Sequence, residues 1–312
     1  MIKRIVVFCA LMITILPTLA VSQFPYTELP YHLPEDAVPQ LRDLQDRILQ
    51  SNLETLLDEN EAWQSLIANE RMSVGLVDLA NPYDVKFAAV NGDVMMYSAS
   101  LPKIAILLAA EQNIHDGKMD ADANILSDMR SMIARSSNAA ATRMIDRIGY
   151  EGIAEVLMDP RYELYDENYG GGLWVGKRFA KQGRRYPDPI KGLSHAATVT
   201  QVSRFYYLLA HGKLVSRDRS KEMLSYLVDP ELHHKFVNSF DRVCPEAKVY
   251  RKSGTWRQWH TDSALVWGPD WRRYILVGLV EDYNGEQILR DLVSVVEEAL
   301  QRSAGFKYAQ NQ

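Results

Sequence analysis

The sequence predicts an α/β (α+β) fold, in which an antiparallel sheet flanked by helices lies beside an all-helical lobe. Three observations support this prediction. Strand-like segments occur near both ends of the chain, the middle is mainly helical, and the last periodic segment is a helix with one apolar face. We therefore expect segments from both ends to join one sheet, while the middle forms the second lobe.

The composition is that of an ordinary globular protein that can bury a large core. Of the 312 residues, 47% are hydrophobic and 24% are charged, which excludes disordered and fibrous classes. The net charge is −5 at pH 7. A mildly acidic chain lacks the basic footprint typical of proteins that bind nucleic acid or anionic membranes. We expect a monomer that acts on a small-molecule or peptide substrate, with no nucleic-acid partner.

The first 22 residues have the pattern of a secretory signal peptide. Lys3 and Arg4 precede the apolar run 5–15, which is too short to span a bilayer, and cleavage is expected after Ala20 or Ser22. This pattern predicts a secreted or periplasmic protein with no membrane span after signal removal.

Cysteine usage gives a further constraint on the mature chain. Cys9 follows Phe8, where a lipoprotein signal requires a small residue, so we expect no lipid anchor. Cys244 is then the only cysteine left, and one thiol cannot form an internal disulfide. The fold must therefore rest on its apolar core.

The first half of the mature chain begins with helix and strand signals. Apolar residues at near-helical spacing over 41–69 predict one long helix, broken near Asn52. Residues 72–78 and 86–90 predict two short strands joined as a hairpin across Asn81 and Pro82. This part of the chain is expected to contribute to the sheet.

Helices dominate the middle of the chain, and strands return in the second half. A mainly helical region over 100–226 is interrupted by a long stretch with glycine and proline, and loops of that length are usually functional or disordered. Strands are then predicted, followed by a final helix with one apolar face. The predicted segments are a loop over 159–194, strands over 249–254, 263–267 and 274–281, and a helix over 286–300. We expect one domain over 23–312, with an α/β lobe formed by about 37–97 and 240–305 and a helical lobe formed by about 98–239.

The first chemical motif is a serine three residues before a lysine. Pro102 is tolerated only in the first turn of a helix, so Ser100 is expected at the start of the helix that continues over 104–110. The spacing places Lys103 within reach of the Ser100 hydroxyl. A lysine whose pKa is lowered by burial can deprotonate a serine nucleophile, although a helix cap beside a surface lysine would have the same sequence.

Two further motifs have the residue types that such a reaction needs. Ser136 falls between two predicted helices, where its hydroxyl can relay a proton to a leaving group and the Asn138 amide can hold a substrate carbonyl. Helix capping is the plainer interpretation of both residues. On a predicted strand, Lys252 can face a substrate carboxylate, Gly254 permits close approach, and the Thr255 N–H can join that of Ser100 as an oxyanion hole.

The three motifs together resemble those of the penicillin-recognising serine enzymes, most closely the class A β-lactamase-like branch. The resemblance implies a β-lactamase/transpeptidase-like fold with Ser100 as the acylated nucleophile and Lys103 as its base or proton relay. It implies that Ser136 belongs to the catalytic set. The residues implied to bind substrate are Asn138, Lys252, Ser253, Gly254 and Thr255. Ser253 replaces the usual threonine, and Ser137 stands where class A enzymes usually have aspartate.

Two departures from the class A pattern affect the expected chemistry. Ser136 lies only 36 positions after Ser100, so we expect that one wall of the cleft is missing and that the substrate is bulkier. The loop after Met158 lacks the Glu-x-x-Leu-Asn motif whose carboxylate activates the deacylating water. Glu167 lies nearest the expected place, with Glu163 and Asp166 as alternatives, and solvated loop acids remain an equal interpretation.

A metal or cofactor is not expected. The seven histidines form no His-Glu-x-x-His or Cys-His cluster. His260 follows the oxyanion strand and could contact substrate or support a hairpin. The sequence thus predicts a serine hydrolase acting on a β-lactam or a related amide or peptide. A penicillin-binding module that is acylated but turns over slowly, or a cell-wall peptidase, remains the alternative.

Overall fold

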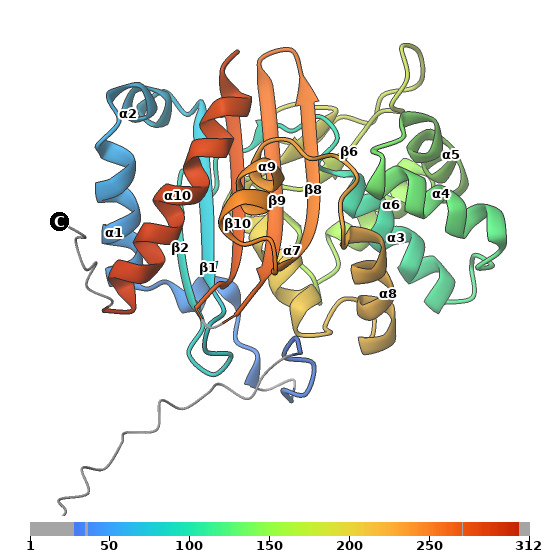
Figure 1. The fold of residues 1–312 in the computed structure, drawn as a ribbon. Coiled ribbons are helices and arrows are strands. Elements are labelled where there is room, and N and C mark those ends of the chain that lie inside the picture. Colours follow the sequence, from blue (N-terminus) through green and yellow to red (C-terminus); the bar gives the residue numbers. More distant parts are fainter. Residues whose placement is uncertain (1–27, 35–36, 270, 306–312) are drawn as a thin grey trace, which may run out of the picture.

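The computed structural model describes residues 28–34, 37–269 and 271–305 (Figure 1). The residues assigned to the signal peptide lie outside these ranges, so that assignment stays a prediction. Among the described helices, none combines the length and the apolar character needed to cross a bilayer.

The described chain forms a sheet with its covering helices and a lobe of helices. The elements of the sheet and its two faces are α1 (Arg47–Asp58), α2 (Glu61–Ala68), β1 (Met72–Asp78), β2 (Lys86–Val90), α7 (Val199–Ala210), α9 (Phe236–Val243), β8 (Lys248–Trp256), β9 (Trp259–Trp267), β10 (Arg273–Glu281) and α10 (Gly285–Ser303). The helices of the lobe are α3 (Lys103–His115), α4 (Ala123–Ala134), α5 (Asn138–Ile148), α6 (Tyr150–Leu157) and α8 (Arg217–Leu227). Short elements connect the two parts: η2 (Leu41–Leu44), β3 (Met96–Tyr97), β4 (Tyr165–Asp166), η3 (Glu167–Tyr169), β5 (Gly171–Gly172), β6 (Trp174–Val175) and β7 (His195–Ala197).

The main sheet has the strand order β2-β1-β10-β9-β8, and all neighbours pair antiparallel. Strands from both ends of the chain therefore meet at the β1–β10 ladder, and the predicted fold class is confirmed. The hairpin of β1 and β2 has the predicted bounds. The three C-terminal strands are longer than predicted, because β8 and β9 continue to the hairpin turn at Arg257 and Gln258.

Alternation along the strands gives the sheet two different apolar faces. Leu76 and Val266 pack in one cluster with α1, α2, α9 and α10, whereas Val77 and Leu265 pack in the other cluster with α7 and the helical lobe. Figure 1 shows α1 and α10 on the near face of the sheet and α7 behind it. Side chains of β8 that differ by one position therefore point to opposite layers.

The long N-terminal helix predicted over 41–69 is two helices, and the predicted break near Asn52 is wrong. The Asn60 side chain accepts hydrogen bonds from the backbone N–H groups of Ala62 and Trp63, which caps the start of α2. Asp46 caps α1 in the same way. Asn52 lies inside α1, where its amide donates to the Ser303 hydroxyl of α10.

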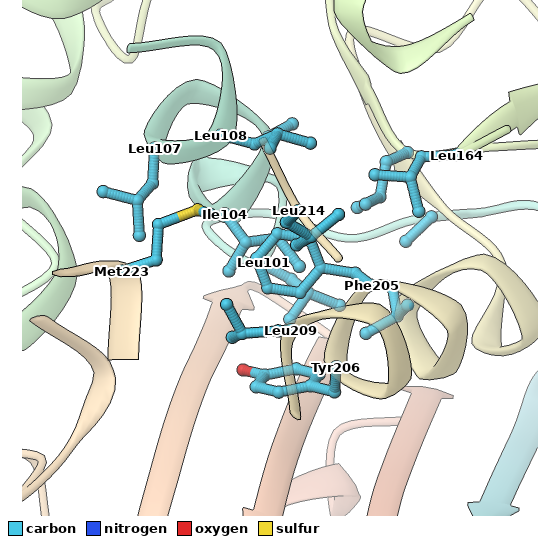
Figure 2. Packing of buried hydrophobic residues seen from close by; sticks show 14 of the residues in the cluster. Leu101, Ile104, Leu107, Leu108, Leu164, Phe205, Tyr206, Leu209, Leu214 and Met223 are labelled. Carbon is cyan, nitrogen blue, oxygen red and sulfur yellow. The ribbon is translucent and has the colours of Figure 1, made fainter. Parts of the chain in front are cut away.

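The helix α3 is buried in the helical lobe and carries Lys103 of the first chemical motif. All its residues from Lys103 to Gln112 are buried. Figure 2 shows Leu101, Ile104 and Leu107 near side chains of α7 and α8. A helix that is buried on all sides is held by its surroundings in every direction, so the start of α3 is a rigid platform.

Candidate active site

Ser100 lies in a tight turn immediately before α3. The Leu101 N–H donates to the Ser98 carbonyl at 3.0 Å, and the Lys103 N–H donates to the Ser100 carbonyl at 3.3 Å. Ala99 has φ of 50°, a left-handed conformation that is uncommon for a residue with a side chain. Such backbone strain persists only where the surroundings enforce it, and it often marks functional turns. The turn leaves Ser100 half-buried, one residue before Leu101 enters the core.

The Lys103 ammonium is fully buried and is held by the second motif. It donates to the Ser136 carbonyl at 2.6 Å, to the Asn138 side-chain oxygen at 2.8 Å and to the Ser136 hydroxyl at 3.3 Å. Ser137 caps α5, which turns the preceding residue so that its carbonyl and hydroxyl face Lys103. Burial lowers the pKa of Lys103 to about 7. A large share of this lysine is therefore a neutral amine near neutral pH, as a base requires.

Lys252 on β8 approaches the same serine hydroxyl from the other side. Its ammonium donates to the Ser136 hydroxyl at 3.0 Å and to the Ser253 carbonyl at 2.8 Å. Burial and then the charge of Lys103 hold the pKa of Lys252 well below its usual range. The Ser136 hydroxyl thus lies between two lysines, which suits a group that passes a proton.

Gly254 brings the edge of β8 against the Ser100 turn. A Cβ atom at this position would lie 2.4 Å from the Ser98 carbonyl oxygen and 2.6 Å from the Ser100 nitrogen. The Thr261 hydroxyl, opposite Gly254 in the ladder, also donates to the Ser98 carbonyl at 3.1 Å. Only glycine permits this approach, so the N–H groups of Ser100 and Thr255 belong to adjacent segments.

Replacing Gly254 with alanine is expected to slow acylation of Ser100 roughly tenfold to a hundredfold, because the added methyl group pushes the strand away from the nucleophile. The rate would be measured with a fluorescent penicillin. Gly152→Ala in α6 is the matched control, since the nearest atom to its added Cβ lies 3.4 Å away. Equal acylation rates in both variants would contradict the assigned role of the Gly254 contact.

Lys235 belongs to the site but could not be found from its sequence neighbourhood. From the turn before α9 it reaches under β8, and its ammonium donates to the Gly254 carbonyl at 2.6 Å, to the Thr255 hydroxyl at 2.8 Å and to the Thr261 carbonyl at 3.1 Å. Burial lowers the pKa of Lys235 to about 7. This lysine supports the strand end that carries the predicted oxyanion donor, on the face opposite Lys252.

The layer beneath β8 also holds a buried ion pair. Arg251 donates to the two carboxylate oxygens of Asp262 at 2.6 Å and 2.8 Å. The same carboxylate accepts from the backbone N–H groups of Phe236 and Ser263. The pair therefore joins β8, β9 and the start of α9, the three segments that position Lys235 and Lys252. Ser253, the residue after Lys252 on the edge strand β8, is also buried.

The structure does not bring Glu167 to the cluster of Ser100, Lys103 and Lys252. Glu167 is exposed in η3, and the neighbouring Tyr169 lies 4.1 Å beneath the Arg42 guanidinium. None of the hydrogen bonds described for Lys103 involves a carboxylate. Glu163 faces away as well, because it pairs with Arg204.

An aromatic ring covers Lys103 instead. The centroid of Phe179 lies 4.5 Å from the Lys103 ammonium, and the same ring packs at 4.2 Å against His195. Burial lowers the pKa of His195 to about 4, so this imidazole is neutral at pH 7. Phe179 had no signal in the sequence, since its contact depends on how the long loop folds back on α3.

His260 also lies apart from Ser100. It pairs with Thr255 in the β8–β9 ladder, and its ring packs against Gly285 at the start of α10. Strand alternation places it in the layer of Arg251, opposite the layer of Lys252. The alternative role in the hairpin fits this position, and the substrate contact stays a prediction.

Among the residues that the structure describes, no group of three or more His, Cys, Asp or Glu side chains is placed to hold a metal ion.

Comparisons with known proteins agree with the fold described above. No curated protein matches the chain. The β-lactamase of Sphaerobacter thermophilus is 14% identical with a TM-score of 0.61, and the match covers 82% of this chain and 98% of that one. PBP-A is 15% identical with a TM-score of 0.60, covering 83% and 97%. An ancestral class A β-lactamase is 16% identical with a TM-score of 0.60, covering 83% and 100%.

At these identities the solved structures show that the fold is shared. The model of the β-lactamase enzyme family matches residues 126–300, which is more than half of the chain and includes the second and third motifs. The chain therefore belongs to the β-lactamase enzyme family.

Proposed function

We propose that the protein is a serine hydrolase that forms an acyl-enzyme on Ser100 and acts on a β-lactam or a related amide or peptide. The observation that supports this most strongly is the placement of the Ser136 hydroxyl between Lys103 and Lys252, at 3.3 Å and 3.0 Å. A helix cap would need neither a buried lysine nor a second one on a distant strand. Three segments far apart in sequence supply these groups, and all adjoin the Ser100 turn.

Each group has a part in acylation. The neutral Lys103 amine takes the proton of the Ser100 hydroxyl, whose oxygen attacks the substrate carbonyl carbon. The N–H groups of Ser100 and Thr255 stabilise the negative charge that develops on the carbonyl oxygen. When the carbon–nitrogen bond breaks, the Ser136 hydroxyl gives its proton to the leaving nitrogen and is reprotonated from Lys103 or Lys252. Water then attacks the ester and releases the acid.

The cations around β8 favour a substrate that carries a carboxylate. Lys252 and Lys235 lie on the two faces of the strand end, and the Thr255 hydroxyl accepts from Lys235 at 2.8 Å. Burying a negative group beside them would restore the charged form of lysines whose pKa is lowered by burial. The β-lactamases named among the structural relatives suit a lactam substrate.

The position of Phe179 favours a second candidate function for the same site, in which acylation is fast and hydrolysis of a β-lactam adduct is slow. Hydrolysis needs a positioned base for water. A phenyl ring cannot accept a proton, and the exposed Glu167 makes no described contact with Lys103. We infer that Phe179 occupies space in which a carboxylate would activate the deacylating water.

Benzylpenicillin is therefore expected to label the protein in a burst that is followed by slow turnover. Phe179→Glu should speed deacylation by about tenfold or more, because it puts a base beside Lys103. Phe179→Gln is the matched control, having the same size without the base. Product release would be followed by absorbance and the adduct by intact-protein mass spectrometry.

Two outcomes would contradict this account of deacylation. The first is rapid penicillin hydrolysis by the unmodified protein without an accumulating adduct. If Glu167→Gln then abolished that turnover, the exposed loop acid would be the base after all. The second is equal deacylation in Phe179→Glu and Phe179→Gln.

A further inference from the structure

The loop over 176–194, which carries Phe179, concentrates positive charge in a chain whose net charge is −5. It contains six basic residues and one acidic residue. The basic residues are Lys177, Arg178, Lys181, Arg184, Arg185 and Lys191, and the acid is Asp188. We call this segment the basic loop. Neither the proposed acylation chemistry nor the family motifs account for this charge.

The fold brings two of these basic side chains close together. Lys177 and Arg185 form an antiparallel bridge, so their side chains lie on the same side of a small hairpin. Tyr186 anchors the hairpin by stacking on Trp174 at 5.7 Å, and its carbonyl accepts from the Trp174 indole at 2.8 Å. Like charges directly opposite one another are destabilising unless an anion binds them. The hairpin is thus held in a shape that an anionic ligand would stabilise.

The charge of the loop is only partly neutralised by the described residues. Arg178 and Arg184 pair with Asp146 of α5 and Glu151 of α6, both at 2.6 Å, and these pairs fasten the loop to the helical lobe. Asp188 is buried, and its carboxylate accepts from backbone N–H groups of the loop itself.

Four cations remain without a carboxylate partner among the described residues. Lys177 donates to the Lys181 carbonyl, Arg185 to the Gly192 carbonyl and Lys191 to the Met95 carbonyl. Lys181 is exposed near the tip of the hairpin, and no described ion pair involves it. Backbone carbonyls hold Lys177, Arg185 and Lys191 in place without removing their charge.

The basic loop adjoins the Ser100 turn. Phe179 lies 4.5 Å from the Lys103 ammonium, and the Lys177 carbonyl lies 3.0 Å from His195 Nε2. The backbone carbonyl of His195 in turn accepts a hydrogen bond from the Ser98 N–H at 3.0 Å. A chain bound along the loop would therefore reach the nucleophile within a few residues.

We propose that Lys177, Lys181, Arg185 and Lys191 bind an extended anionic part of the substrate, so that the natural substrate is a polymer or peptide with several carboxylates or phosphates near its reacting carbonyl. This inference rests on the proposed function, since it names the substrate class of the same site. A small neutral lactam would leave the loop surface unused. The short interval between Ser100 and Ser136 is consistent with room for such a chain.

Binding can be tested without turnover. Fluorescence anisotropy would measure the affinity of a labelled oligomer of L-glutamate and of a labelled linear polyphosphate, which separates carboxylate from phosphate recognition. We expect Lys177→Gln/Lys181→Gln/Arg185→Gln to weaken the better probe roughly tenfold at low salt, and less as salt is raised. The matched control is Lys118→Gln/Arg242→Gln/Lys248→Gln, which removes the same charge from exposed positions elsewhere.

Two controls separate this inference from the proposed function. Binding should persist in Ser100→Ala, because the loop does not depend on the nucleophile, so a failure of acylation chemistry would leave the anisotropy result intact. The bound oligomer should also slow labelling of Ser100 by a fluorescent penicillin in the unmodified protein. The inference is overturned if neither probe binds, if both triple variants bind equally, or if the bound oligomer leaves the labelling rate unchanged.

Discussion

Replacing Lys103 with methionine is expected to slow acylation of Ser100 by ~10²–10⁴-fold, the usual contribution of a general base. Methionine is one atom shorter than lysine and fills most of the buried space, so the loss reports the missing amine. Stopped-flow labelling with a fluorescent penicillin would measure the rate. An acylation rate equal to that of the unmodified protein would remove Lys103 from the mechanism.

The same assignment determines the pH profile of acylation. Since burial lowers the pKa of Lys103 to about 7, the fraction of neutral amine rises as the pH passes upward through 7 and then levels off. The acylation rate should follow that fraction, and the profile should be flat across this range in Lys103→Met. A rate that continued to rise toward pH ~10 would mean that the lysine keeps an ordinary pKa.

Replacing Arg251 with methionine is expected to destabilise the fold by ~3–5 kcal/mol, because it leaves Asp262 buried without its counter-charge. Both side chains are nearly inaccessible, at 2% and 0% exposure. Urea unfolding with an unchanged slope would measure the free-energy change.

The control for this prediction is Arg302→Met, which removes an exposed ion pair with Glu298 on α10. Exposed helix pairs contribute only about 0.3–0.5 kcal/mol. If Arg251→Met cost no more than this control, the buried pair would not be what holds β8, β9 and α9 together.

Much of the fold could be predicted because the information is local. The hairpin of β1 and β2 follows from apolar runs with a proline turn between them, and its bounds were predicted without error. The break between α1 and α2 was misplaced because Asn52 and Asn60 look alike in sequence. Only at Asn60 does the backbone leave the helix, so that its side chain can cap the next one. Where the backbone leaves the helix depends on packing.

The candidate site also contains some residues that local sequence motifs identified and others that they could not. Ser100, Lys103, Ser136 and Lys252 could be selected because each belongs to a short motif, and the structure brings the Lys103, Ser136 and Lys252 side chains together beside the Ser100 turn. Lys235 reaches the site through a turn far from any motif, and Phe179 reaches it through the fold of the basic loop. Such contacts between distant segments leave no local pattern.

The position of His260 depends on a strand register that the sequence did not predict, because the strand was expected to begin at residue 263. Residues 252 and 254 share one face of β8, so Thr255 and its ladder partner lie on the other face. Glu167 was chosen by its distance along the chain from Met158, but η3 turns outward between Asp166 and Gly170 and exposes it. Distance along a loop is a poor guide to position when the loop forms its own short strands.

The central claim is that Ser100 becomes acylated. The most direct test is to incubate the protein with benzylpenicillin, digest it, and map the modified peptide by tandem mass spectrometry, with Ser100→Ala as the control. We predict a single adduct on the Ser100 hydroxyl of the unmodified protein and no adduct in a folded Ser100→Ala variant. An adduct on another residue, or equal labelling of both proteins, would contradict the account.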